Sequence, residues 1–452
     1  MTENPTQPFI ASNSAGRVAD AKPAGSQLKR RKLLGFGAFA TLVAGFSAAA
    51  SLGSAAPAAA TTGLTPDARD YGAVGDGSSD DTEPLKKWLA AGGSELTDGV
   101  FRITSGLTLL GDNRTFCTRN ARIVADQADI TALTVQGANT KISAHIDGNN
   151  KANIGLKISG PGATVESSTI ENFYSKTTAA RGVEVTTGGG CTVRDNLIRN
   201  VGSLGDTTLG NGNGSARAIL LSNSGAASQK SVIAGNTIDN VFGEEGDAIQ
   251  ILFYDAAASI NASADVTISG NDISNVSRRF IKVQASNVRI VGNTLGHAGV
   301  TPANPSNSID VIRGDDVTIS DNRIAPNPLG VVINVVGSAG FLCRRVVIRD
   351  NVIRQDDEKK YTSMFLNYLS QAVVRDNTIF GGGTAIAIGN STVVSVQGNI
   401  HHGGDSAATS FSANSTNTGV VMLSNVNMNS ARKACTANTS VGALTEMNVS
   451  RT

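Results

Sequence analysis

The chemistry that the sequence could support begins with acidic residues near the middle of the chain. Glu244 and Glu245 stand just before Asp247, and basic residues flank them at Arg217 and Arg279. Hydrolysis of a glycosidic bond needs one protonated and one ionised carboxyl group, about 5–5.5 Å apart for retention or about 6.5–9.5 Å apart for inversion. Neighbouring guanidinium groups favour the ionised form of Asp247, so Glu244 or Glu245 would supply the proton.

Other residues in the same interval leave two alternatives open. Asp310 is a further candidate carboxylate. Arg279 and Lys282 offer a different chemistry, because the elimination that cleaves uronic-acid glycans uses a basic side chain to remove a proton. A third interpretation is that the charged residues form only surface ion pairs, each worth little. The candidate substrate-binding residues are Arg217, Arg279, Lys282, Gln250, Tyr254 and His297.

A repeated phrase supplies the scaffold for these residues. The pattern apolar-x-apolar-x-[Gly/Asp]-Asn-x-Ile recurs, as in DVTISGNDIS (265–274) and DVTISDNRIA (316–325). A fixed phrase with filler of variable length is typical of a solenoid. Its alternation of period two, rich in Val, Ile and Thr, predicts a strand that ends at a corner. Aligning the phrase places these residues in one column: Asn196, Asn236, Asn271, Asn293, Asn322, Asn351, Asn377 and Asn399.

A second strand precedes the phrase in each repeat, for example AIQI (248–251) and FIKV (280–283). Stacking such strands about 4.8 Å apart forms parallel sheets in which each coil pairs with its neighbours. The sequence therefore predicts an all-β fold, a single-stranded right-handed parallel β-helix of about ten coils. Each asparagine of the column would point inward at a tight corner, tolerate unusual backbone angles and bond its counterparts in a ladder.

Superposing the second strands places the candidate residues in two rows on one face of this β-helix. Asp310 would lie two coils from Asp247, at least ~9.6 Å away. Loops beside a rigid sheet commonly build binding clefts, and the loop 241–246 carries Glu244 and Glu245. The corner row contains Arg181, Arg217, Asp247, Arg279 and Asn307. The outward row contains Glu184, Leu220, Gln250, Lys282, Asp310, Asn334 and Asn367.

The first sixty residues predict an export signal. Arg30 and Arg31 precede a run of apolar residues, and APAAA (56–60) offers a cleavage site of small residues. This segment resembles a twin-arginine signal, which implies a secreted, extracellular protein without a membrane segment after cleavage. A membrane anchor is the alternative, because the apolar run reaches about 20 residues.

The beginning of the expected mature chain resembles a known superfamily. The phrase DYGAVGDGSSDDT (70–82) leads into a predicted amphipathic helix, capped by Asp81 or Thr82, whose buried face includes Trp88. This opening and the repeats resemble the pectate-lyase-like superfamily over about 70–400. The resemblance implies a parallel β-helix with a capping helix, and it is compatible with hydrolases, lyases, epimerases and tailspike depolymerases. The His-containing and Arg-rich catalytic phrases of several such families are absent, so no exact family is identified.

Composition narrows the partners and the cofactors. With 38 basic and 37 acidic residues, the chain lacks the excess positive charge that nucleic-acid binding requires. The four cysteines, Cys117, Cys191, Cys343 and Cys435, lack metal-binding spacing. Either disulfides, with Cys343–Cys435 as one option, or buried thiols are compatible with the sequence. We expect no metal and no cofactor, and a monomer or a homotrimer.

These observations predict three regions and one class of activity. Residues 1–60 form the export signal, 61–410 the capping segment and β-helix, and 411–452 the C-terminal strands or cap. We expect a secreted enzyme that cleaves glycosidic bonds of a polysaccharide or oligosaccharide, with a glycoside hydrolase or a glycan-transferring relative favoured. A polysaccharide lyase acting on a uronic-acid glycan is the first alternative. A non-catalytic glycan-binding or surface β-helix is the second.

Overall fold

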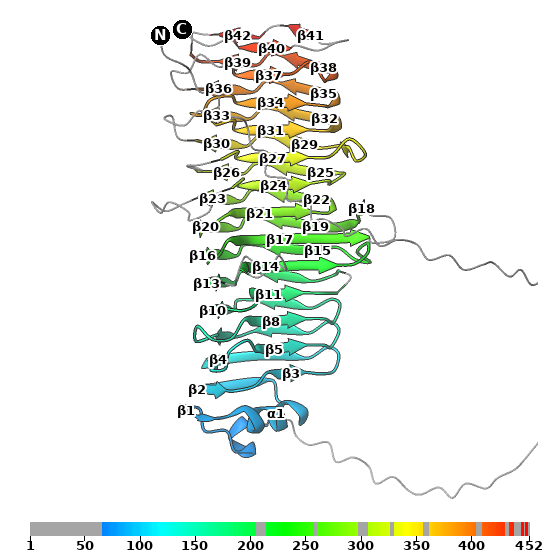
Figure 1. Ribbon diagram of the computed structural model, residues 1–452. Coiled ribbons are helices and arrows are strands. Elements are labelled where there is room, and N and C mark those ends of the chain that lie inside the picture. The colour runs from blue at the N-terminus through cyan, green and yellow to red at the C-terminus, as the bar shows by residue number, and fades with distance from the viewer. Residues whose placement is uncertain are drawn as a thin grey trace, which may run out of the picture. The chain divides into compact units, whose positions relative to one another are not determined.

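The computed structural model describes residues 66–452, apart from several short segments (Figure 1). The predicted export signal and His297 therefore lie outside the described residues. The segments left out are 188, 205–213, 256–259, 297–305, 326–329, 356–360, 404–408, 430–433, 438–443, 447 and 451–452.

One face of the solenoid is a stack of parallel strands that carries the candidate site. In it, each strand pairs with the strand one coil earlier and the strand one coil later, and only β18 (Ile260–Asn261) pairs antiparallel, with β17. We call this stack the site sheet. Its strands are β3 (Leu107–Leu109), β5 (Thr131–Val135), β8 (Ile154–Ile158), β11 (Ala180–Val185), β14 (Ser215–Asn223), β17 (Glu245–Asp255), β21 (Arg279–Gln284), β24 (Ile309–Ile312), β27 (Ile333–Val336), β31 (Met364–Asn367), β34 (Ile386–Gly389), β37 (Phe411–Ala413) and β40 (Cys435–Ala437).

The larger sheet has two columns of stacked strands that meet at a bend. It begins with β1 (Asp76–Asp80), β2 (Glu95–Ile103) and β4 (Thr115–Ala125), and β4 pairs with both columns. The first column contains β6 (Lys141–Ser143), β9 (Thr164–Glu166), β12 (Thr192–Arg194), β15 (Ser231–Ala234), β19 (Ser263–Ser269), β22 (Ser286–Val291), β25 (Val317–Ser320), β28 (Cys343–Arg344), β29 (Val347–Arg349), β32 (Leu369–Arg375), β35 (Thr392–Gln397), β38 (Thr418–Leu423) and β41 (Leu444–Glu446). The second contains β7 (His145–Asp147), β10 (Thr169–Ser175), β13 (Leu197–Ser203), β16 (Thr237–Phe242), β20 (Asp272–Val276), β23 (Thr294–Gly296), β26 (Arg323–Ile324), β30 (Val352–Arg354), β33 (Thr378–Phe380), β36 (Ile400–His402), β39 (Val426–Asn427) and β42 (Val449–Ser450).

The predicted all-β parallel β-helix is therefore confirmed. The described strands make about 12 turns, so the expected count of about ten coils was slightly low. Inward side chains of successive coils stack into apolar rows that form the core. One such row is completely buried and contains Ile219, Ile249, Ile281, Ile309 and Ile333.

The predicted asparagine ladder is present and longer than expected. From Asn196 onward, each side-chain amide donates to the Oδ1 of the next asparagine at 2.8–3.0 Å, and the ladder continues through Asn425 to Asn448. The eight asparagines of the predicted column are at most 2% exposed. These bonds satisfy polar groups in the interior and hold the bend at the same place in each coil that carries the ladder.

The reason given for these corners needs one correction. The asparagines were expected to adopt the unusual backbone angles, but the residue before each one does so. These preceding residues have φ between 55° and 67°, the left-handed region that Gly, Asp and Asn tolerate best. They are Asp195, Gly235, Gly270, Gly292, Asp321, Asp350, Asp376 and Gly398.

A short cap covers the first coil, as predicted. The 3-10 helix η1 (Ala68–Tyr71) and helix α1 (Thr82–Ala90) lie at this end in Figure 1, and Trp88 is completely buried. Asp81 is the N-cap residue, but its carboxylate accepts hydrogen bonds from the backbone of Val74 and Gly75 and does not cap the helix. Asp81 therefore ties the entry segment to the helix.

The register of the site sheet confirms both predicted rows with one exception. Arg181, Arg217, Asp247 and Arg279 align along β11, β14, β17 and β21. In the outward row, Asn334 pairs with Phe365, and Asn367 lies two residues further along β31. The placement of Asn367 in that row was therefore wrong, and Phe365 takes this position in β31.

Two other features constrain how the chain is held. All four cysteines are free thiols, so the Cys343–Cys435 disulfide is not formed. Burial raises the pKa of Cys191 and of Cys343 to about 11, which leaves both thiols protonated at neutral pH. Among the described residues, no helix combines the length and the apolar character needed to cross a membrane.

Candidate functional site

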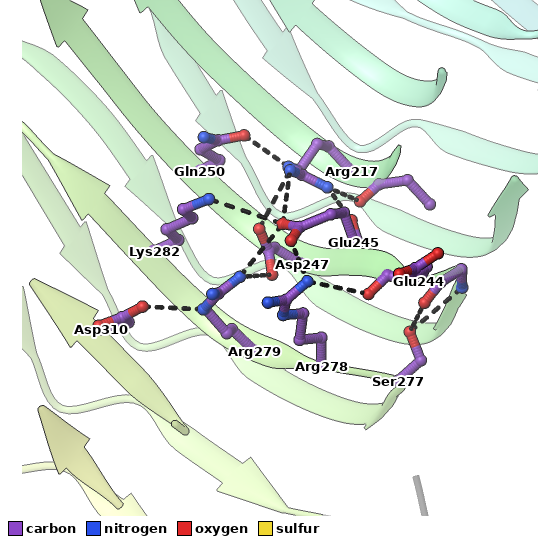
Figure 2. Close-up of polar contacts among 12 residues, drawn as sticks. Arg217, Glu244, Glu245, Asp247, Gln250, Ser277, Arg278, Arg279, Lys282 and Asp310 are labelled. Carbon is purple, nitrogen blue, oxygen red and sulfur yellow. Dashed lines mark hydrogen bonds and ion pairs between the residues drawn. The ribbon is translucent and has the colours of Figure 1, made fainter. Parts of the chain in front are cut away.

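The candidate site lies on the outer face of the site sheet, where the corner row and the outward row meet. Contacts between the rows show that they face the same side. Arg217 Nε donates to Gln250 Oε1 at 2.5 Å, and Arg279 Nε lies 2.8 Å from Asp310 Oδ2. Figure 2 shows these side chains converging from neighbouring strands. We call Arg217, Glu245, Asp247, Arg278, Arg279 and Lys282 the charged cluster.

Asp247 is the most deeply buried member of the charged cluster. Its side chain is 0% exposed and lies between two guanidinium groups, 3.2 Å from Arg217 Nη2 and 3.2 Å from Arg279 Nη1. Asp247 Oδ2 makes no hydrogen bond with a described residue, although the ion pair to Arg217 is within range. The interpretation of these residues as a ladder of ion pairs on the surface is wrong in one respect, because the ladder is buried.

Glu245 is the carboxylate of the charged cluster that solvent reaches. It begins β17, and its side chain is 32% exposed. Arg278 donates to it at close range, and Arg279 Nη1 lies 3.3 Å away. Lys282 Nζ at 3.7 Å and Arg217 Nη2 at 3.8 Å complete a ring of four cations. Burial raises the pKa of Glu245, but these four cations outweigh burial and lower it below the usual value.

The surroundings of Lys282 disfavour its charged form. Burial, together with the positive charges of Arg279 and Arg217, lowers its pKa below that of an ordinary lysine, although Asp247 and Glu245 oppose the shift. A lysine with a lowered pKa spends more of its time as a neutral amine and can accept a proton. The side chain is 13% exposed, so its amine is only partly covered.

The remaining predicted acids differ in their surroundings. Asp310 is buried, and it accepts a hydrogen bond from Asn334 Nδ2 at 2.8 Å while facing Arg279. Glu244 is exposed and belongs to the short connection between β16 and β17. The loop expected at 241–246 is therefore only two residues long, because both strands extend into it. Asp310 and Glu244 do not contact Asp247 in any described interaction.

A cavity adjoins the charged cluster on the same face. It has a volume of about 550 Å³ and is lined by residues at the ends of β11, β14, β17 and β21, including Tyr254 and Gln284. Gln250 donates to Gln284 Oε1 at 3.0 Å and so connects the cavity to Arg217. Tyr254 is 44% exposed, whereas its neighbour Phe253 is completely buried. Of the predicted binding residues, Gln250 therefore lies beside Arg217, and Tyr254 lies at the cavity.

Sequence reasoning missed Arg278. Its guanidinium holds Glu245, yet the residue belongs to neither aligned row. The dipeptide Arg278-Arg279 at the corner was the available signal, because both guanidinium groups lie within ion-pair range of Glu245 in the preceding coil.

The described residues offer no arrangement suited to a metal ion. No group of three or more His, Cys, Asp and Glu side chains in this part of the chain could hold one. Both ring nitrogens of His401 are engaged, by Ser410 Oγ and the carbonyl of Gly381, and His402 stacks on Phe380 at 4.8 Å.

Comparison with known proteins supports the fold more than the activity. Residues 239–430 match the family described as periplasmic copper-binding protein (NosD), which covers less than half of the chain. No curated protein matches the sequence. Among the described residues of the matched region, no group of three or more His, Cys, Asp and Glu side chains could hold a metal ion, so we derive nothing from copper.

Solved structures that resemble the chain are parallel β-helix proteins of diverse roles. The N-terminal fragment of bacteriophage Phi29 gene product 12 has a TM-score of 0.60 at 15% identity, covering 85% of this chain and 71% of that one. The Streptococcus pneumoniae surface adhesin PfbA has a TM-score of 0.54 at 16% identity, with coverage of 81% and 93%. A PL6 alginate lyase in complex with a trisaccharide has a TM-score of 0.52 at 13% identity, with coverage of 83% and 87%. These structures thus support the parallel β-helix fold.

Proposed function

We propose that this protein acts on a uronic-acid-containing glycan and cleaves it by β-elimination, with Lys282 as the base. The observation that carries this proposal is the lowered pKa of Lys282 within a ring of cations around Glu245. β-Elimination needs a neutral base near C5 of the uronate and positive charge beside its carboxylate. In the charged cluster, Lys282 would provide the base, and the arginines would provide the positive charge.

The same geometry makes hydrolysis the weaker choice. A hydrolase needs one carboxylic acid that stays protonated until it donates to the leaving oxygen. Four cations lower the pKa of Glu245, and this favours its ionised form. Asp247 has no exposed surface from which to reach a sugar. We therefore favour the elimination that sequence analysis held as the first alternative.

The position of the Glu245 carboxylate suggests how the cations could bind the carboxylate of a uronate. Its carboxylate occupies the centre of the ring formed by Arg217, Arg278, Arg279 and Lys282. A substrate carboxylate is chemically equivalent, and it would displace the partly exposed side chain of Glu245 from Arg278 and Arg279, which leaves the amine of Lys282 to act as the base. Arg278 is the most exposed of the four cations, so it would make the first contact. Arginine suits this role because its planar fork matches a carboxylate.

The proposed step balances in the following way. The neutral amine of Lys282 takes the proton from C5 of the uronate, the electrons form the C4–C5 double bond, and the bond from C4 to the glycosidic oxygen breaks. The departing oxygen takes a proton from water, and Lys282 returns its proton to solvent. Positive charge at the uronate carboxylate stabilises the carbanion-like transition state. The neighbouring sugar would occupy the cavity beside Tyr254, whose exposed ring can stack on it.

The test measures two products at once on a panel of polysaccharides. We expect polygalacturonate, alginate or hyaluronate to yield new reducing ends together with ultraviolet-absorbing unsaturated ends, and neutral glucans and fructans to yield neither. Lys282→Arg keeps the positive charge but cannot act as a neutral base, so turnover should fall at least ~10²-fold. Activity of the unmodified protein should rise with pH along a limb that lies below the ordinary lysine pKa.

Two variants separate elimination from its alternatives. Glu245→Gln removes the internal competitor, so KM for the uronate should fall and turnover should persist, whereas a hydrolase that uses Glu245 would lose ~10²-fold. Lys157→Arg is the matched control, because Lys157 occupies the same outward column in β8. New reducing ends without unsaturation would overturn the proposal in favour of hydrolysis. Binding without cleavage across the whole panel would favour a non-catalytic glycan-binding protein.

A further inference from the structure

A second cleft lies in the larger sheet, far from the charged cluster along the chain. It has a volume of about 430 Å³ and lies on the outer side of the bend between β6 and β7. In Figure 1, β4 lies toward the end of the solenoid that carries α1, and β10 lies further along the stack. The polar residues that line the cleft are Thr118, Asn120, Arg122, Ser143, His145, Ser167 and Thr169.

His145 is held in this cleft by a buried carboxylate. Its Nε2 lies 2.8 Å from Glu171 Oε1, and Arg199 Nε donates to Glu171 Oε2 at 2.7 Å. Burial raises the pKa of Glu171, but the bonds from His145 and Arg199 outweigh burial and lower it, so Glu171 is an anion. An anionic Glu171 requires the proton on Nε2 of His145, which leaves Nδ1 for a ligand.

Arg122, like His145, lies beside a buried carboxylate. Its Nη1 lies 3.6 Å from Asp147 Oδ2, and Asp147 also accepts bonds from the backbone N–H of Asn149 and from Asn172 Nδ2. The Asp147 side chain is 12% exposed, whereas the Arg122 side chain is 43% exposed. A buried carboxylate thus forms an ion pair with an arginine whose side chain remains accessible to solvent. Arg122 and His145 come from adjacent strands, one residue before the paired Ile123 and Ile146.

We infer that this cleft binds a sugar acid, with the carboxylate on Arg122 and ring hydroxyls on His145 and its hydroxyl-bearing neighbours. Arginine recognises a carboxylate through two parallel hydrogen bonds. His145 Nδ1, Asn120 and the Ser and Thr side chains provide donors and acceptors for sugar hydroxyls. The volume falls within the range of about 300–1,000 Å³ that is common for small-molecule sites. This site does not depend on the reaction proposed above.

The imidazole of His145 provides a direct probe of binding. The chain contains four histidines, so the ring Cε1–H resonances of the full chain can be resolved by NMR and assigned with His145→Gln. We expect D-glucuronate to shift the His145 resonance saturably and to leave that of His402 unchanged. Acetate, which has only the carboxylate, and D-glucose, which has only hydroxyls, should each bind at least ~10-fold more weakly, because each loses charged or neutral hydrogen bonds.

Variants complete the test and separate the two sites. Arg122→Gln should weaken glucuronate binding at His145 at least ~10-fold, while Arg345→Gln, which changes an exposed arginine paired with Asp316, should not. Lys282→Arg should leave the response intact, because a monosaccharide has no glycosidic bond to break and the charged cluster is elsewhere. The inference is overturned if acetate or glucose matches glucuronate, if Arg122→Gln has no effect, or if the response requires Lys282.

Discussion

Asp247 depends entirely on its charged neighbours, because water does not reach it. Two buried guanidinium groups flank it, and burial lowers the pKa of Arg217 despite the opposing effects of Asp247 and Glu245. From sequence, these residues resembled exposed ion pairs whose loss would change stability little. Their burial reverses this expectation, because a buried charge that loses its partner is costly.

Replacing Asp247 by Asn should therefore destabilise the protein. The amide keeps the shape but removes the charge that compensates Arg217 and Arg279, so the free energy of unfolding should fall by about 3 kcal/mol or more. The urea midpoint measures this loss. Asp316→Asn is the control, because Asp316 pairs with Arg345 in the open, and it should change stability by less than about 1 kcal/mol. Equal midpoints for both variants would show that Asp247 is not held as a buried charge.

The sequence predicted most of the charged cluster but not its electrostatics. The repeat placed Arg217, Asp247 and Arg279 in one row, because strand register follows directly from a period of one coil. It did not reveal that Glu245 is the exposed carboxylate or that Arg278 binds it. Burial and side-chain direction at a corner depend on neighbouring coils, and a linear pattern carries no information about them.

At the scale of one corner, the [Gly/Asp]-Asn pair divides two tasks between two residues. The first residue adopts a left-handed backbone conformation, as Gly292 does with φ of 67°. The second contributes the ladder, as Asn293 does by donating to Asn322 Oδ1 at 2.9 Å. The alternation of Gly and Asp in the phrase is therefore explained by backbone geometry, which sequence analysis assigned to the asparagine.

Gly292 allows the backbone contribution to be measured alone. A Cβ added there meets no atom within 4 Å, so a substitution introduces strain without a clash. Gly292→Val should lower the free energy of unfolding by about 1–2 kcal/mol, and Gly292→Asn by clearly less, because Asn tolerates the left-handed region. Urea denaturation of the two variants checks the difference. If Val and Asn cost the same, then strain at φ does not explain the phrase.

At the scale of the solenoid, the phrase was sufficient for the fold but not for the number of coils. The ladder begins at Asn196, and in the preceding coil Ser168 is the residue whose backbone donates to it. The coils that contain β5 and β8 have Ala144 and Ser168 at the equivalent position of the bend, so a count of phrases does not include them. Parallel stacking nevertheless continues through these coils, because backbone pairing does not require the ladder.

A solenoid contacts only its neighbouring coils, so damage at one end should remain local. Trp88 seals the first coil: its side chain packs against Phe116, with ring centroids 6.2 Å apart, and its indole N–H donates to the carbonyl of Pro66 at 2.6 Å. Trp88→Ala should cost about 3–5 kcal/mol locally and leave the edge of the first strands exposed.

Hydrogen exchange measured along the chain tests whether this loss stays local. In Trp88→Ala, backbone amides of α1 and β1–β3 should lose protection, while those of β21 and β24 beside the charged cluster should keep it. Met422→Ala, which opens a completely buried position in β38, should give the mirror-image result near the other end. Loss of protection throughout the chain in either variant would mean that the coils unfold as one cooperative unit. The charged cluster would then depend on both ends of the solenoid, and variants at Lys282 and Glu245 could be interpreted only in a protein with intact ends.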